Sequence, residues 1–83
     1  MSKWEKLFER IMSGDADANI RFDETCALLQ RLKWSVRIRG SHHWFTKSGM
    51  PPINLQPRQG YVKPYQVKQI REALEIDPDV RTN

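Results

Sequence analysis

The chain has no acidic residue between Arg31 and Arg71, although this stretch holds nine lysines and arginines. About a quarter of the residues in an ordinary domain are charged, so roughly five acidic residues are expected there by chance. All ten carboxylates of the 83-residue sequence lie in residues 1–30 and 72–83. Together with a formal net charge of +4, this asymmetry predicts a polyanionic ligand for the middle of the chain.

Other scarce features exclude whole classes of protein. The single cysteine, Cys26, excludes an internal disulfide and indicates a reducing, cytoplasmic location. Its apolar neighbours favour a thiol in the core over a reactive one. The sequence has neither a run of about 18 apolar residues nor a signal-peptide pattern, so no membrane association is expected. His42 and His43 point apart in a predicted strand and lack a nearby carboxylate, so no metal or other cofactor is expected.

The spacing of apolar residues predicts three helices. The first covers residues 3–12. The second runs from an N-cap at Asp23 to about Lys33, because a short carboxylate side chain suits that position. The third begins at Pro64, which is favourable in a first helical turn, and ends before Asp77.

Between the last two helices the apolar residues recur with a period of two, which is typical of strands. The predicted strands cover residues 34–39, 42–47 and 53–56, with a two-residue turn at Gly40-Ser41 and a loop at 57–60. This order predicts an α+β domain, in which helices pack on one face of a three-stranded antiparallel sheet. A single domain of residues 1–83 is expected, with an N-terminal helical extension at 1–20, a core at 21–76 and a polar tail at 77–83.

Strand pleating separates the two histidines, because neighbouring residues of a strand point to opposite faces. A two-residue turn pairs Arg39 with His42 and Ile38 with His43, and cross-strand partners share a face. A one-residue bulge at Gly40 would reverse this assignment, so His43 remains the alternative to His42. The open face is predicted to hold Arg37, Arg39, His42, Trp44, Thr46, Asn54 and Gln56. The core face is predicted to hold Trp34, Val36, Ile38, His43 and Phe45.

An exposed imidazole flanked by arginines is suited to the cleavage of RNA. The neutral ring of His42 can take the proton of an RNA 2′-hydroxyl, while Arg37 and Arg39 hold the phosphate. Trp44 can stack an unpaired base, which contributes roughly 1–3 kcal/mol. No second histidine shares the face to protonate the leaving oxygen. The secondary candidates for RNA contact are Arg58 and Lys63.

Two alternatives use the same charge without catalysis. In the first alternative, the chain is a non-catalytic RNA-binding module, whose binding weakens with salt and leaves RNA intact. In the other alternative, the basic face is matched to an acidic protein.

Several local motifs occur together in a fixed order. A helix ends with Leu29 to Leu32 and is followed by Trp34 and by the run Arg39-Gly40-Ser41-His42-His43. The strand Ile53–Leu55, the loop Pro57–Gly60 and a helix from Lys63-Pro64 to Leu74 follow. In these features the stretch from Phe22 to Leu74 resembles the HicA toxin family, the ribonuclease half of bacterial toxin–antitoxin pairs.

This resemblance implies a double-stranded-RNA-binding-domain-like fold and cleavage of mRNA by a metal-independent endoribonuclease. It also implies a catalytic histidine in the Gly-Ser-His motif, which is His42 here, and a HicB-like antitoxin that covers this histidine. Three features differ from the family pattern. Gln59 stands where a histidine is frequent, Lys33 stands where a glycine often precedes the aromatic residue, and residues 1–20 are additional. The role of the additional residues stays open between packing, a dimer contact and an antitoxin contact.

Overall fold

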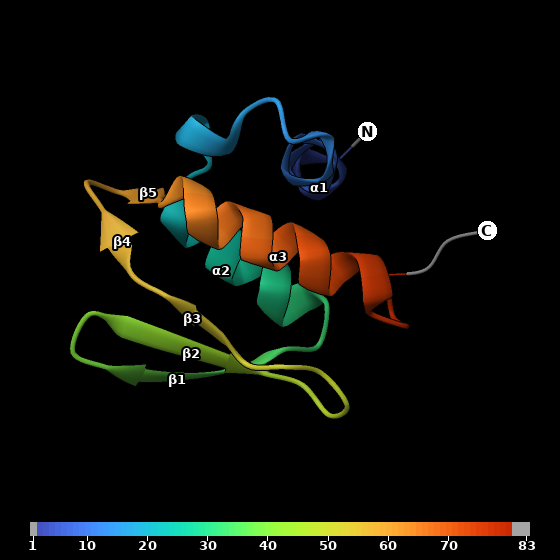
Figure 1. The fold of residues 1–83 in the computed structure, drawn as a ribbon, viewed down its shortest axis with the longest axis vertical. Coiled ribbons are helices and arrows are strands. Elements are labelled where there is room, and N and C mark those ends of the chain that lie inside the picture. The colour runs from blue at the N-terminus through green and yellow to red at the C-terminus, as the bar shows by residue number, and fades with distance from the viewer. Residues whose placement is uncertain (1, 81–83) are drawn as a thin grey trace.

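The computed structural model describes residues 2–80, and it contains three α-helices around a small sheet (Figure 1). The last three residues of the predicted tail lie outside the described part. The helical elements are α1 (Lys3–Ser13), the short 3-10 helix η1 (Asp17–Asn19), α2 (Phe22–Arg31) and α3 (Pro64–Ile76). The strands are β1 (Ser35–Arg39), β2 (His42–Thr46), β3 (Ile53–Leu55), β4 (Pro57–Arg58) and β5 (Tyr61–Val62).

The main sheet is antiparallel with the strand order β1-β2-β3. Helices α2 and α3 lie on one side of it, and α1 lies beyond them (Figure 1). Thus the sequence α2-β1-β2-β3-α3 forms a two-layer α+β unit with one open sheet face. This confirms the predicted double-stranded-RNA-binding-domain-like fold with an additional N-terminal helix.

Helix α2 begins two residues earlier than predicted. Arg21 occupies its N-cap position without a capping side chain, and Asp23 lies in the first turn. The prediction of Asp23 as N-cap is therefore wrong. The reason is tertiary, because the Phe22 N–H donates to the Gly60 carbonyl and the Val62 N–H donates to the Ile20 carbonyl. These bonds fix the chain just before the helix.

The predicted loop at 57–60 is in fact a second hairpin. Pro57 pairs with Val62 and Arg58 pairs with Tyr61. Its two turn residues, Gln59 and Gly60, have φ angles of 54° and 88°, as a tight two-residue hairpin turn requires. No sequence pattern predicted this hairpin, because two-residue strands show no alternation and a proline argues against a central strand.

The N-terminal helix is an integral part of the core. Leu7 and Ile11 of α1 are buried, and Ile20 beyond it is buried completely. Arg71 of α3 donates to the Ile11 carbonyl over 2.9 Å and to both carboxylate oxygens of Asp17 over 3.0 Å. Of the roles left open for residues 1–20, packing is therefore the one that the structure shows.

One residue of the predicted core face is in fact exposed. Trp34 and Phe45 are buried as expected, but 59% of Ile38 is accessible to solvent. Ile38 does lie on the helix side of the sheet, opposite the half-buried His43. It stays exposed because β1 is an edge strand that lies on the far side of β2 from the helices (Figure 1).

A buried carboxylate joins the two layers at the end of α3. Asp77 is fully buried, and it accepts hydrogen bonds from Trp34 Nε1 over 3.0 Å and from Lys47 Nζ over 2.6 Å. Lys47 also donates to the Leu32 carbonyl and pairs with Asp79 over 2.7 Å. The segment predicted to be a polar tail therefore starts with a structural residue.

We expect Lys47→Met to lower the free energy of unfolding by about 3–5 kcal/mol, because it leaves Asp77 buried without its cation. The control is Lys68→Met, which replaces an exposed lysine of α3. Its free energy of unfolding should change by at most about 0.5 kcal/mol. Urea denaturation followed by circular dichroism measures both. An equal effect of the two variants would contradict the structural role of the cluster.

The same cluster predicts how this difference depends on pH. The hydrogen bond from Lys47 lowers the pKa of Asp79. Burial lowers the pKa of Lys47, but hydrogen bonds to Asp77 and Asp79 outweigh it and raise that pKa. The ion pairs of Lys47 therefore contribute their whole stabilisation between about pH 4 and pH 10, and this contribution decreases below and above that range. The difference in the free energy of unfolding between the wild type and Lys47→Met should therefore become smaller in acid.

Lys33 occupies the position where a glycine is frequent in the resembling family, and its φ angle is 75°. A non-glycine residue in this left-handed conformation costs roughly 1 kcal/mol. We expect Lys33→Gly to raise the free energy of unfolding by up to about 1 kcal/mol. Lys33→Ala keeps the unfavourable conformation and removes the same side chain, so it should give no gain. Equal stability of the two variants in urea would show that the turn is not strained.

Candidate functional site

The hairpin of β1 and β2 has the register predicted from its two-residue turn. Arg39 pairs with His42, Ile38 with His43 and Arg37 with Trp44. No extra residue is inserted at Gly40, whose φ angle of 58° suits the tight turn. Because cross-strand partners share a face, Arg37, Arg39, His42 and Trp44 project from the same side of the sheet.

The two histidines have different surroundings. His42 is exposed on the open face. His43 is half-buried on the helix side, where its ring meets the edge of the Phe22 ring at a centroid distance of 4.8 Å. The imidazole of His42 can therefore meet a ligand from solvent, whereas His43 has a packing role.

The open face continues from β2 onto β3. Trp44 is 40% exposed and pairs with Asn54. The side-chain oxygen of Asn54 is buried and has no hydrogen-bond partner among the described residues. Gln56 donates from Nε2 to the hydroxyl of Ser41 over 3.0 Å, which ties the β1–β2 turn to the segment that leads into β4.

Arg58 and Lys63 lie outside the main sheet. Arg58 is exposed in β4, and Lys63 is the half-buried N-cap residue of α3. Both hairpin turns lie at the same end of the molecule (Figure 1), but no described contact joins either residue to His42. The structure therefore brings together four of the predicted site residues, and it leaves these two in a neighbouring basic area.

Two residues near the turns were missed by the sequence pattern. Arg21 bridges to Tyr61, and its guanidinium lies 5.5 Å from the centre of the Tyr61 ring. Phe22 supports His43. Arg21 is the N-cap residue of α2 and Phe22 is its first residue, so both lie far in the sequence from residues 43 and 61. Only the fold brings them together.

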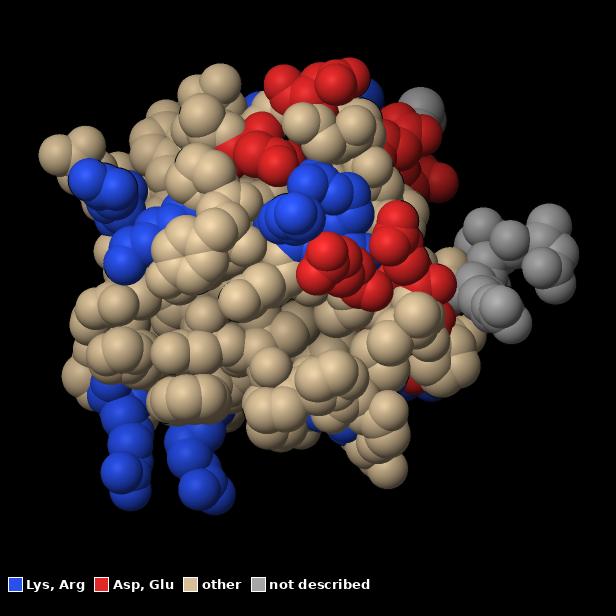
Figure 2. Space-filling view, viewed as in Figure 1, with Lys and Arg blue, Asp and Glu red and all other residues tan. Residues whose placement is uncertain are grey.

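No acidic residue belongs to the strands of the main sheet, which all lie between Arg31 and Arg71. Basic side chains extend from the sheet, away from the helices, while the carboxylates gather near α1 and the end of α3 (Figure 2). No salt bridge within residues 2–80 involves Arg37 or Arg39. The cations of the open face are thus available to an anionic ligand.

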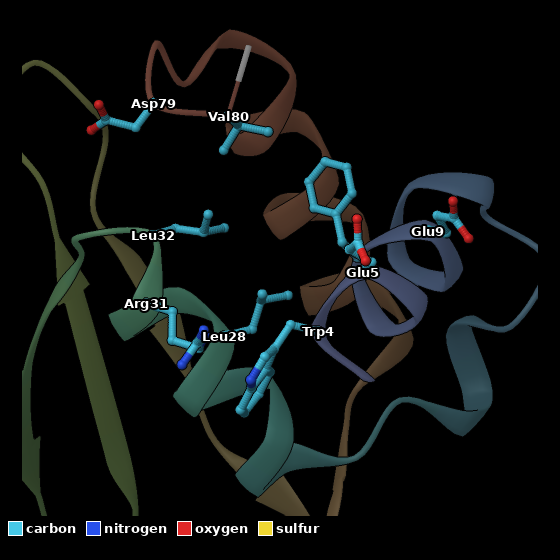
Figure 3. A pocket seen from close by; sticks show the side chains of 9 residues that line it. Trp4, Glu5, Glu9, Leu28, Arg31, Leu32, Asp79 and Val80 are labelled. Carbon is cyan, nitrogen blue, oxygen red and sulfur yellow. The ribbon is translucent and has the colours of Figure 1, made fainter. Parts of the chain in front are cut away.

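A groove lies elsewhere, between α1, α2 and the turn after α3 (Figure 3). It has a volume of about 530 Å³, and Trp4, Phe8, Leu28, Leu32 and Val80 form its apolar part. It contains none of the predicted site residues. The candidate site is therefore an exposed surface and not an enclosed pocket, as is common for ligands that are themselves long and charged.

Neither a metal centre nor a membrane span is found in the described part of the chain. No three His, Cys, Asp or Glu side chains of residues 2–80 gather closely enough to hold a metal ion. Likewise, none of the described helices is both long and apolar enough to cross a membrane.

The fold and its exposed face define a small α+β domain with a cationic sheet surface around one imidazole. Residues 22–76 match the family model described as HicA toxin of bacterial toxin-antitoxin. This match covers more than half of the chain, so the protein belongs to the HicA toxin family, which implies an antitoxin partner. No curated protein and no solved structure matches the chain.

Cys26 is the single thiol of the sequence, and its surroundings predict low reactivity. Burial, followed by the charge of Asp23, raises the pKa of this thiol from 9.0 to about 11. The thiolate fraction near neutral pH is therefore lower by about a hundredfold, and alkylation by iodoacetamide should slow accordingly. The reaction in guanidinium serves as the control and should proceed at the rate of a free thiol. A native rate equal to the unfolded one would contradict the partly buried position.

Proposed function

We propose that this protein is a metal-independent endoribonuclease that cleaves mRNA and thereby arrests growth. The observation that carries the proposal is the pairing of Arg39 with exposed His42 on the uncovered side of the sheet. Membership of a toxin family and the lack of acidic residues between Arg31 and Arg71 support it. The expected site of action is the cytoplasm, where mRNA is translated.

In the proposed reaction the RNA supplies its own nucleophile. A neutral ring nitrogen of His42 takes the proton of the 2′-hydroxyl, and the 2′-oxygen attacks the adjacent phosphorus. The bond to the 5′-oxygen breaks, and this oxygen takes up a proton from water or from a nearby acid. The products are a 2′,3′-cyclic phosphate and a 5′-hydroxyl end. No metal is needed, because the attacking oxygen is already part of the substrate.

Three further residues of the open face have roles in this scheme. Arg37 and Arg39 offset the negative charge that builds on the phosphate during attack. Trp44, with 40% of its surface exposed, offers a ring on which an unpaired base can stack. Arg58 and Lys63 extend the cationic surface toward the second hairpin and contact the RNA farther along its backbone.

The proposed partner is a HicB-like antitoxin that binds over His42 and excludes RNA. Family membership implies an antitoxin, and the exposed imidazole identifies the surface that such a partner has to cover. A neighbouring reading frame that encodes a HicB-like protein would support this part of the proposal.

One observation favours a non-catalytic RNA-binding module instead. Among the described residues no hydrogen bond involves the ring of His42, whereas Nδ1 of His43 lies 3.4 Å from the Ser41 carbonyl oxygen. General bases in many active sites are oriented by such a bond. Analysis of RNA ends after incubation separates the two functions, because a binding module leaves the RNA intact.

We expect His42→Gln to reduce the rate of RNA cleavage by roughly 10²–10⁴-fold, because glutamine cannot take the proton. Binding of a non-cleavable 2′-deoxy analogue should change little. The matched control is His43→Phe, which keeps an aromatic ring against Phe22 and should retain cleavage. Gel analysis of labelled RNA and growth arrest on expression measure the effect.

Two outcomes would contradict this assignment. If His42→Gln cleaves RNA at the wild-type rate and a folded His43→Phe does not cleave it, then His43 is the catalytic histidine. Intact RNA with the wild-type protein, despite salt-sensitive binding, would identify a binding module.

A further inference from the structure

Strand β1 forms a free edge of the main sheet. It spans Ser35–Arg39 and pairs with β2 alone, and no strand of residues 2–80 pairs with its other side. In an antiparallel pair, the backbone groups of alternate residues point away from the partner strand. These outward N–H and carbonyl groups can pair with one more strand.

The helix side of this edge is apolar and uncovered. Ile38 is 59% exposed, and Val36 beside it is half-buried and packs against the core. In Figure 1 the helices lie above β3, and β1 is the strand on the far side of β2. An exposed isoleucine next to unpaired backbone groups provides an apolar contact for an added strand.

The opposite side of the same edge is cationic. Arg37 and Arg39 alternate with Val36 and Ile38, and both are exposed. None of the salt bridges in residues 2–80 includes either arginine. Basic side chains extend freely from the sheet side of the molecule (Figure 2). An added strand therefore meets an apolar row on one face and two guanidinium groups on the other.

We propose that the outer edge of β1 binds an extended segment of another protein in which acidic and apolar residues alternate. The acidic residues lie on the side of Arg37 and Arg39, and the apolar residues lie on the side of Ile38. Opposite charges on paired strands stabilise the pair, and the period of two places each kind of side chain on its own face.

A second copy of this chain fits the same edge poorly in the register that pairs all five residues of β1. Antiparallel pairing of two β1 strands about a twofold axis at Arg37 places the two copies of Arg37 opposite each other. Like charges opposite each other destabilise a strand pair. The arginines therefore act against self-association and select a partner of opposite charge.

The test is fluorescence anisotropy of the full-length protein with a labelled peptide of alternating glutamate and valine. One control peptide has the same composition with the glutamates and valines in separate blocks. A second control carries N-methyl groups along one edge, which prevents backbone pairing. The alternating peptide should bind clearly more tightly than either control, and hydrogen exchange should show new protection in β1.

Variants of the protein test the two faces separately. Ile38→Thr keeps a strand-forming residue and should weaken binding roughly three- to fivefold. Its RNA cleavage should persist, since Ile38 lies on the face opposite His42. This result distinguishes a failure of the strand-binding proposal from a failure of the nuclease proposal.

Charge exchange tests the choice of partner. Arg39→Glu should lose affinity for the glutamate–valine peptide and gain affinity for a lysine–valine peptide. The control Arg58→Glu makes the same change of charge in the second hairpin and should alter neither affinity. Equal binding of the alternating and block peptides would overturn the proposal, and so would binding that survives N-methylation. A dimer of the protein that Ile38→Thr dissociates would also overturn it, because a second copy would then be the partner.

Discussion

The buried carboxylate of Asp77 is the constraint on which the arrangement of the two layers depends. A charged group without access to water needs donors in fixed positions, since unpaired burial is very costly. Its donors come from Trp34, just before β1, and from Lys47, just after β2. Lys47 in turn donates to the last turn of α2 at Leu32. The sheet and both of its covering helices can satisfy these bonds in one relative position only.

With that end of the sheet fixed, the tight turn at Gly40 and Ser41 determines which side chains face solvent. A shift of one residue in β2 would move Phe45, which is fully buried, to the open face. Trp44 or Thr46 would then take its place in the core. The exposure of His42 beside Arg39 is therefore a consequence of core packing, and it needs no separate stabilising contact. The candidate site is as well determined as the position of Phe45.

The parts that could be predicted from the sequence are those determined by neighbours along the chain. The register of β1 and β2 follows from alternation around a two-residue turn, and α3 follows from its apolar spacing. The burial of Asp77 could not be predicted, because its partners lie 43 and 30 positions away. The exposure of Ile38 likewise depends on how far the helices reach across the sheet. In the site, the contact of Gln56 with Ser41 escaped prediction for the same reason.

The family match extends from residue 22 to 76, yet the core needs more of the chain. Ile11, Ile20 and Asp77 are fully buried and lie outside that segment. The α1 extension packs beyond the helices and leaves the sheet uncovered (Figure 1). It also carries several of the carboxylates that gather on that side of the molecule (Figure 2). The addition therefore enlarges the core and leaves the arginines of the open face as the first charges that an anionic ligand approaching the sheet will meet.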